Sequence, residues 1–287
     1  MNKLKMKFSY VENNMGDMLN VMIPRDVFGV EIKHTQNPYV ADSTGIGSYL
    51  NTYFVPKSAY KEFSTLKKIG MKAFDTFENE TKIWSTGFIS YAAEEEVCIR
   101  SSKIKIASVR GELSKQRLEK ILNQKLDITT GDGGLLSSEL IKSTTKKFEI
   151  GIIPHFKELD EKIYSEILSK YPSIKLIDLR KEPYSVLEEI SECEYILSSS
   201  LHGLIVSDSL RIPNLRIITS NRLLGDGFKF DDYYSSFGIE SNRVVVNKVE
   251  DFPTINNIID SYKINDEMVD KKKSEIYDAF FKDMNFK

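Results

Sequence analysis

The chain has 287 residues, of which 41% are hydrophobic, and its formal net charge is −2. These values predict a globular protein with enough residues for two domains, and the near-neutral charge argues against nucleic-acid binding as its main role. The two cysteines, Cys98 and Cys193, provide no disulfide framework and favour a reducing, cytoplasmic location. No apolar run approaches the ~20 residues of a membrane span, and Met1 to Phe8 lacks the apolar core of a signal peptide, so we expect at most peripheral membrane contact.

A predicted strand and a turn open the chain. Leu4 to Phe8 alternates apolar residues with lysine, which is typical of a strand, and the turn after it offers Asn13 and Asn14 as helix caps. Gly16 comes next, and a glycine there would let the backbone approach a ligand closely. A capped turn without a ligand is the other interpretation of these residues.

Small-residue turns follow later strands of this half. Gly45-Ile46-Gly47-Ser48 comes after the predicted strand Glu31 to His34, but Leu50 stands where a dinucleotide fingerprint needs its third glycine. We therefore interpret it only as a weak candidate for a phosphate loop. Ile128 to Leu136 predicts a further strand and a glycine turn at Gly131-Asp132.

Arg110 directly follows the predicted strand Ile104 to Val109 and precedes a predicted helix. An arginine at the carboxyl end of a strand can bind a carboxylate or phosphate with two parallel hydrogen bonds. The alternative is a surface arginine that pairs with Glu112.

The alternation of strands and helices predicts an α/β fold with two Rossmann-like domains that face a common cleft. The short polar stretch from Ser143 to Lys147 predicts a linker. We therefore expect an N-terminal domain at 1–144, a C-terminal domain at 145–265, and a last helical segment at 266–287, long enough to cross back to the first domain. The predicted helix in that segment spans Asp266 to Met284.

Ser198 to Leu210 is the stretch to which we assign the chemistry. Its serines and Gly203 lie where a buried strand, Tyr195 to Leu197, gives way to an apolar helix. In an open α/β sheet such a turn lies where ligands bind, and the free N–H groups of the helix favour anions. His202 is in the first helical turn, where the helix dipole should lower its pKa and favour a neutral imidazole that can act as a base. The alternative is a serine-capped helix whose histidine only packs or forms hydrogen bonds.

With these residues laid out, the chain resembles the polysaccharide pyruvyl transferase family. Each matching piece alone is weakly specific. The resemblance depends on all of them occurring together, in the order that the family has. The pieces are Gly16-Asp17-Met18-Leu19-Asn20, Gly45-Ile46-Gly47-Ser48, Trp84-Ser85-Thr86-Gly87-Phe88, Val109-Arg110-Gly111, Gly131-Asp132 with Leu135, Pro154-His155-Phe156, Ser199-Ser200-Leu201-His202-Gly203 and Phe230-Asp231-Asp232-Tyr233-Tyr234.

The resemblance implies a fold similar to the B-type glycosyltransferases and the transfer of pyruvate from phosphoenolpyruvate, as co-substrate, to a sugar or lipid-linked oligosaccharide. The product is a pyruvate ketal in a surface polysaccharide or exopolysaccharide. His202 is then expected to move protons and Arg110 to hold the donor's anionic groups. Ser199, Ser200, Leu201 and Gly203 complete the expected donor site. On the acceptor or cleft side we expect Gly16, Asp17, Asn20, Gly47, Ser48, Gly131, Asp132 and His155.

Two residues depart from the family pattern. Ser200 stands where family members often have an arginine before the Leu-His pair, and Gly133 stands where a proline is common. The missing anion contact would then be supplied by one of three arginines elsewhere in the domain: Arg211, Arg216 or Arg222.

Other readings of the sequence remain open. His155 is at least as well explained by structural hydrogen bonding, and we interpret His34 as structural. The absence of an Asp-x-Asp motif or a Cys/His cluster predicts no metal and no resident cofactor. A nucleotide-sugar glycosyltransferase of the same fold is one alternative; Glu158 and Glu166 have the spacing of an acidic pair, but we interpret both as part of a solvated helix face. A degenerate member that only binds a glycan is another.

Overall fold

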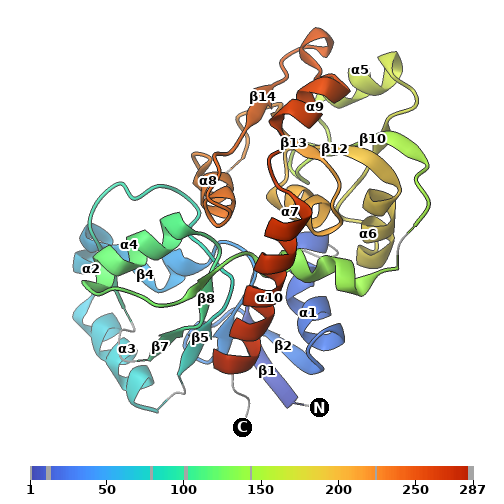
Figure 1. The fold of residues 1–287 in the computed structure, drawn as a ribbon. Coiled ribbons are helices and arrows are strands. Elements are labelled where there is room, and N and C mark those ends of the chain that lie inside the picture. Colours follow the sequence, from blue (N-terminus) through green and yellow to red (C-terminus); the bar gives the residue numbers. More distant parts are fainter. Residues whose placement is uncertain are drawn as a thin grey trace.

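The computed structural model describes residues 2–10, 14–77, 80–99, 103–142, 144–223 and 225–283. Two five-stranded sheets dominate it, one in each half of the chain, and all their strands are parallel (Figure 1). The prediction of an α/β fold with two parallel sheets is confirmed. Three predicted positions lie outside the described residues: the cap Asn13, the linker residue Ser143 and the helix end Met284.

The first sheet has the order β2-β1-β3-β5-β7. Its strands are β1 (Asn2–Lys7), β2 (Val30–Thr35), β3 (Ser43–Thr44), β5 (Thr81–Ile83) and β7 (Ile104–Ile106). Helix α1 (Met15–Asp26) connects β1 to β2, and the side chain of Asn14 caps it by accepting the Asp17 N–H at 3.4 Å. The other elements of this half are η1 (Leu50–Thr52), β4 (Phe54–Pro56), α2 (Lys57–Glu62), α3 (Thr65–Phe77), β6 (Glu96–Cys98), β8 (Ser108–Val109), α4 (Glu112–Leu122), β9 (Thr129–Thr130) and η2 (Gly133–Leu140).

The second sheet has the order β11-β10-β12-β13-β14. Its strands are β10 (Phe148–Ile153), β11 (Lys175–Leu176), β12 (Cys193–Ser198), β13 (Asn214–Ile218) and β14 (Arg243–Val245). The helices of this half are α5 (Lys162–Lys170), α6 (Pro183–Ser191), α7 (Leu201–Ser209), α8 (Phe228–Ser235), η3 (Val249–Asp251), α9 (Ile255–Ser261) and α10 (Asp266–Asp283). Within the described residues, no helix is both long and apolar enough to cross a bilayer.

Each sheet therefore reverses its strand order once. In the first sheet the reversal lies between β1 and β3, and in the second it lies between β10 and β12. Ligands of open α/β sheets bind beside the carboxyl ends of the strands at such a reversal. The loops that leave these four strands are thus the places where the topology favours a site.

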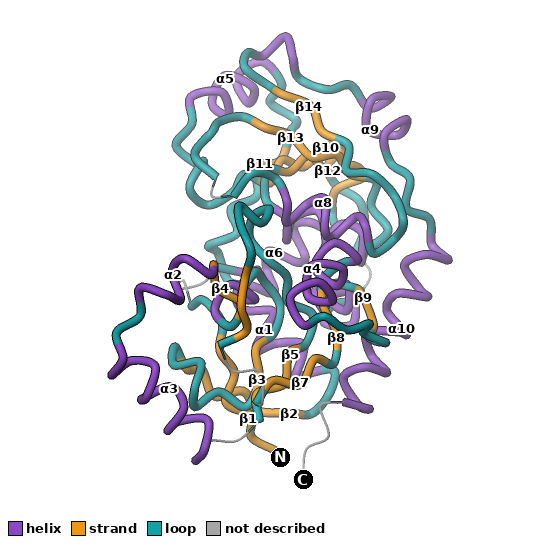
Figure 2. The backbone as a smooth tube through the Cα atoms, turned by 90° about the vertical axis from the view of Figure 1, so that its left-hand side faces the viewer, coloured by secondary structure: helices purple, strands orange, loops and turns teal. Residues whose placement is uncertain are grey.

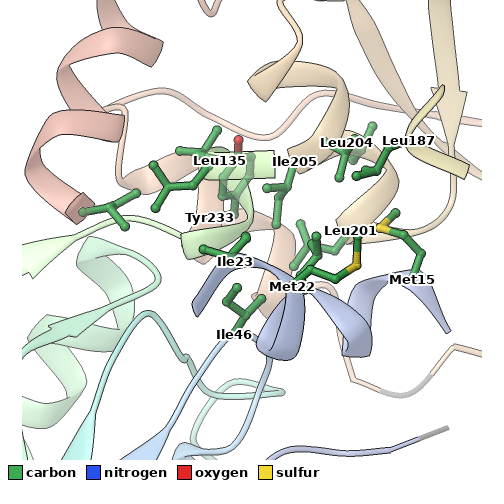
Figure 3. Close-up of a cluster of buried hydrophobic side chains, with 14 of the residues drawn as sticks. Met15, Met22, Ile23, Ile46, Leu135, Leu187, Leu201, Leu204, Ile205 and Tyr233 are labelled. Carbon is green, nitrogen blue, oxygen red and sulfur yellow. The ribbon is translucent and has the colours of Figure 1, made fainter. Parts of the chain in front are cut away.

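The two halves share one hydrophobic core. Figure 3 shows Met15, Met22 and Ile23 of α1 packed near Leu201 and Ile205 of α7. All five side chains are buried, so α1 of the first half and α7 of the second are held against each other.

Helix α10 comes from the second half and packs against the first (Figures 1 and 2). Phe280 stacks on Phe28 with ring centroids 3.8 Å apart and meets Trp84 edge-on at 5.0 Å. Ile276 lies against Gly131, where an added Cβ would be 2.7 Å from the isoleucine Cδ1.

We expect Phe280→Ala to lower the free energy of unfolding by about 3–5 kcal/mol, because it removes a fully buried aromatic ring. Phe281 is 50% exposed, so Phe281→Ala is a matched control on the same helix, with an expected loss below about 1 kcal/mol. Urea denaturation followed by circular dichroism measures both values. Equal losses in the two variants would contradict this packing of α10.

Candidate active site

The turn between β12 and α7 is built by serine hydroxyls and a glycine. The Ser198 hydroxyl accepts the Ser200 N–H at 3.0 Å and lies 2.9 Å from the Ile153 carbonyl oxygen, which ties the turn to β10. At Gly203 an added Cβ would collide with the Ser198 hydroxyl, so only glycine lets the helix begin this close to the strands. Ser200 is the N-cap residue, but its side chain makes no capping hydrogen bond, so the serine cap of the alternative interpretation is wrong. Leu201 is buried in the shared core.

His202 projects from this turn toward α1. An added Cβ at Gly16 would collide with its Nδ1, so the ring lies directly on the backbone of α1. Its Nε2 is buried and has no hydrogen-bond partner among the described residues.

The pKa of His202 is lowered to about 3, chiefly by burial and then by the positive charges of Lys229 and Arg110. The direction agrees with the prediction, although burial rather than the helix dipole is the main cause. The imidazole is therefore neutral near pH 7, with one proton and one free lone pair.

Arg110 is fully buried and forms an ion pair with Asp232 of α8. Its Nε and Nη2 lie 2.9 Å from Asp232 Oδ2, and Nη2 also donates to the Phe88 carbonyl at 2.6 Å. Nη1 donates to the Ser48 hydroxyl at 2.8 Å and to the Gly47 carbonyl at 3.2 Å. The alternative of a surface arginine paired with Glu112 is wrong. Donor binding by Arg110 stays a prediction, and protein acceptors already occupy all three of its nitrogens.

Asp232 is a residue to which the sequence analysis gave no role. Its Oδ1 accepts the Ser114 N–H at 2.7 Å, and its Oδ2 accepts the Ser114 hydroxyl at 2.7 Å as well as Arg110. The sequence feature that could have marked Asp232 as functional is its position in the segment Phe230 to Tyr234, which resembles the family. The contact joins α8 of the second half to α4 of the first.

Gly47 and Ser48, two of the first-half residues predicted for the cleft, contact this ion pair, and Asn20 supports their loop. Asn20 is buried, and its Nδ2 donates to the Ile46 carbonyl at 2.9 Å and to the Asp17 carbonyl at 3.2 Å. Asn20 thus fixes α1 to the loop whose Gly47 and Ser48 bind Arg110. An acceptor-binding role for these residues stays a prediction.

Asp132 is a buried carboxylate in the same region. Its Oδ1 accepts the Gly134 N–H at 2.9 Å, whereas its Oδ2 has no partner among the described residues. Burial raises the pKa of Asp132 to about 6, against the opposing effects of Gly134 and Arg110. Gly131 beside it is covered by Ile276 of α10.

His155 and Ser199 meet where β10 and β12 end. The backbone N–H of His155 donates to the Ser199 hydroxyl at 2.9 Å, and the Ser199 hydroxyl donates to Glu158 Oε2 at 2.5 Å. The pKa of His155 is lowered to about 4 by burial and by the charges of Lys229 and Lys157.

The two glutamates of the glycosyltransferase alternative lie in different surroundings. Glu158 is fully buried and accepts the hydroxyls of Ser199 and Ser220, so its assignment to a solvated face is wrong. Glu166 is on the surface and pairs with Lys162 at 2.6 Å, as the solvated-face prediction expects. Glu158 and Glu166 therefore do not form a cooperating acidic pair, despite their spacing in the sequence.

The residues predicted from separate motifs thus converge at the two reversals of strand order. Gly47 and Ser48 follow β3 in the first sheet, while His155 and His202 follow β10 and β12 in the second. No group of three or more potential metal-ligating side chains occurs in the described part of the chain.

A family model described as polysaccharide pyruvyl transferase matches residues 47–221, which is more than half of the chain. The chain belongs to the polysaccharide pyruvyl transferase family. The matched region includes Arg110, Asp132, His155 and His202.

Two curated relatives align with part of this family member. It is 31% identical over 165 residues to the uncharacterized protein L143 of Acanthamoeba polyphaga mimivirus, covering 51% of this chain and 57% of that protein. It is 26% identical over 136 residues to the succinoglycan biosynthesis protein ExoV of Rhizobium meliloti (strain 1021), covering 47% of this chain and 41% of that protein. The matches span only about half the length of these relatives.

Among solved structures, the chain is similar to the S. aureus MnaA–UDP co-structure. The TM-score is 0.46 at 12% identity, with 96% of this chain and 91% of the other covered. A TM-score this low carries no weight for function.

Lys229, like Asp232, is a residue near the candidate site of this pyruvyl transferase family member to which the sequence analysis gave no role. It lies in the first turn of α8, and burial together with the positive charges of Arg110 and Arg216 lowers its pKa to about 8. A lysine on a short helix resembles any surface lysine in sequence, so no local pattern marked it.

We expect Asp232→Ala to lower the free energy of unfolding by about 3–5 kcal/mol, because it leaves the buried Arg110 without its counter-charge. The neighbouring Asp231 accepts a hydrogen bond from Tyr91 at the surface, so Asp231→Ala is the matched control, with an expected loss below about 1 kcal/mol. Urea denaturation measures both values. A wild-type stability for Asp232→Ala would contradict a structural role for the pair.

The low pKa of His202 predicts a loss of stability in acid. A histidine in the unfolded chain titrates near its ordinary pKa of 6.5, whereas folded His202 gains its proton only near pH 3. Between these values the unfolded state binds more protons, so the free energy of unfolding falls with falling pH, by up to about 1.4 kcal/mol per pH unit. We expect His202→Gln to remove this contribution below about pH 6 and to leave the pH slope above about pH 7.5 unchanged. Denaturation titrations across this range measure the slope, and an unchanged acid slope in the variant would contradict the assignment.

Proposed function

We propose that this protein transfers the pyruvyl group of phosphoenolpyruvate to two hydroxyls of a sugar, forming a pyruvate ketal during synthesis of a surface polysaccharide or exopolysaccharide. Family membership over residues 47–221 supports the reaction class, and the printed name of the succinoglycan biosynthesis relative supports the pathway class. The acceptor, free or lipid-linked, is proposed on the same grounds. We place the reaction in the cytoplasm, with no metal and no resident cofactor.

The observation that carries the proposal is the neutral imidazole of His202 in the matched region, whose buried Nε2 has no hydrogen-bond partner among the described residues. The reaction needs a proton on the methylene carbon of phosphoenolpyruvate and the removal of a proton from the attacking hydroxyl. The negative charges of a bound donor would raise the pKa of His202 from about 3, and an imidazole so shifted can accept one proton and return another.

The proposed sequence of bonds is balanced. The first sugar hydroxyl loses its proton and forms a C–O bond to C2 of phosphoenolpyruvate, while the methylene carbon gains a proton and becomes a methyl group. The second hydroxyl then forms its C–O bond at C2, the C–O bond to phosphate breaks, and phosphate leaves with the second proton. No oxidant or reductant is needed.

Residues of the first half suit the acceptor side of this reaction. Asp132 has one carboxylate oxygen without a partner among the described residues, and an acceptor hydroxyl is a chemically matched donor for it. Asp17, in the first turn of α1 beside Gly16, is a second candidate for holding an acceptor hydroxyl.

The experiment is a transfer assay with phosphoenolpyruvate and a panel of sugar and lipid-linked acceptors, read by mass spectrometry for pyruvate addition and by phosphate release. We expect the wild-type protein to modify at least one acceptor, and His202→Ala to lower kcat roughly 10²–10⁴-fold while donor affinity changes little. Thermal unfolding of both proteins shows that the comparison concerns folded molecules. A kcat for His202→Ala within about threefold of wild type would contradict proton transfer by His202. Phosphate release without pyruvate on any acceptor would contradict the transferase assignment.

A further inference from the structure

Arg216 lies beside the turn that carries His202. It is on β13, and its backbone pairs with Ser198, the last residue of β12 before the turn. Strand β13 runs parallel to β12, so Arg216 comes near the same carboxyl edge of the sheet.

The guanidinium of Arg216 is buried and forms no ion pair among the described residues; the charge of Asp231 acts on it only from beyond ion-pair distance. The residue is 7% exposed, and its Nη1 has no hydrogen-bond partner among the residues that the structure describes. The guanidinium stacks on the ring of Phe230 at 3.6 Å, and among the described residues no carboxylate lies within 4 Å of it. A buried charge is costly unless an opposite charge or hydrogen bonds compensate it.

The other two arginines that might replace the family arginine at Ser200 are already paired on the surface. Arg211 forms ion pairs with Asp266 and Asp270. Arg222 forms ion pairs with Asp160 and Glu161 at 2.7 and 3.0 Å. Of the three candidates, Arg216 is therefore the one that forms no ion pair with a carboxylate of the described chain.

Lys229 adds a second cation that forms no ion pair among the described residues; the charge of Glu158 opposes the lowering of its pKa only in part. Its Nζ lies 5.2 Å from the centroid of the Phe230 ring on which Arg216 stacks, and no carboxylate among the described residues lies within 4 Å of it. The positive charge of Arg216 is among those that lower the pKa of Lys229. The positive charge of Lys229 in turn lowers the pKa of His202. These charges repel one another, and a bound anion would relieve the repulsion.

We propose that Arg216 and Lys229 form the anion-binding part of the active site and hold the phosphate or carboxylate of a small polyanionic donor beside His202. The identity of that donor as phosphoenolpyruvate rests on the proposed function. Arg110, whose nitrogens are all held by Asp232, Phe88, Ser48 and Gly47, then serves to position the two halves of the protein.

The test is titration calorimetry of the full chain with phosphoenolpyruvate and, separately, with inorganic phosphate. We expect Arg216→Gln and Lys229→Gln each to weaken phosphoenolpyruvate binding roughly tenfold or more, as the loss of a charge-assisted hydrogen bond implies. Arg222→Gln is the matched control, because it removes an arginine of the same half that is already paired at the surface; its Kd should stay within about twofold of wild type. Circular dichroism and thermal unfolding confirm that each variant is folded.

Unchanged Kd values in both folded site variants would overturn the proposal, and so would a wild-type protein that binds neither anion. An equal loss in Arg222→Gln would also overturn it, because the effect would then be one of net charge. If the variants weaken binding as expected while the wild-type protein transfers no pyruvate, the anion site stands and the proposed function fails.

Discussion

The buried ion pair between Arg110 and Asp232 is the interaction on which the rest of the structure depends. An arginine out of water is tolerated only when its N–H groups find acceptors, and here Asp232, Phe88, Ser48 and Gly47 supply them. Because Asp232 belongs to α8 and its partners belong to the first half of the chain, the pair holds the two halves in one arrangement. The same helix carries Lys229 and Phe230, so the pair also fixes the anion-binding part of the site.

Burial then decides the chemistry of the groups around this pair. It keeps the imidazole of His202 neutral near pH 7 and raises the pKa of Asp132 toward neutrality. It also lowers the pKa of Arg216 to about 10 and that of Lys229 to about 8, and neither cation forms an ion pair with a carboxylate in the described chain. The buried region around this pair therefore contains a neutral imidazole, a partly unsatisfied carboxylate and two cations that favour an anionic ligand.

Much of this arrangement follows from local sequence patterns. The strand-to-helix turn at Ser199–Gly203 and the cap at Asn14 depend on neighbouring residues, so the sequence predicts them. Glu158 shows where local reasoning fails. Its place in a charged segment suggested a solvated face, but the hydroxyls of Ser199 and Ser220, 41 and 62 residues away, hold it inside the protein.

The sequence by itself determined the α/β class, the order of the motifs and the family, because each rests on short-range periodicity and on residues within a few positions of one another. Only the tertiary structure decided what each charged residue faces. Arg211, Arg216 and Arg222 are equivalent candidates in sequence for the missing anion contact, and their roles differ because Arg211 and Arg222 form ion pairs with carboxylates whereas Arg216 forms none among the described residues. The electrostatic environment of a side chain depends on burial and on partners far along the chain, and local sequence patterns contain neither.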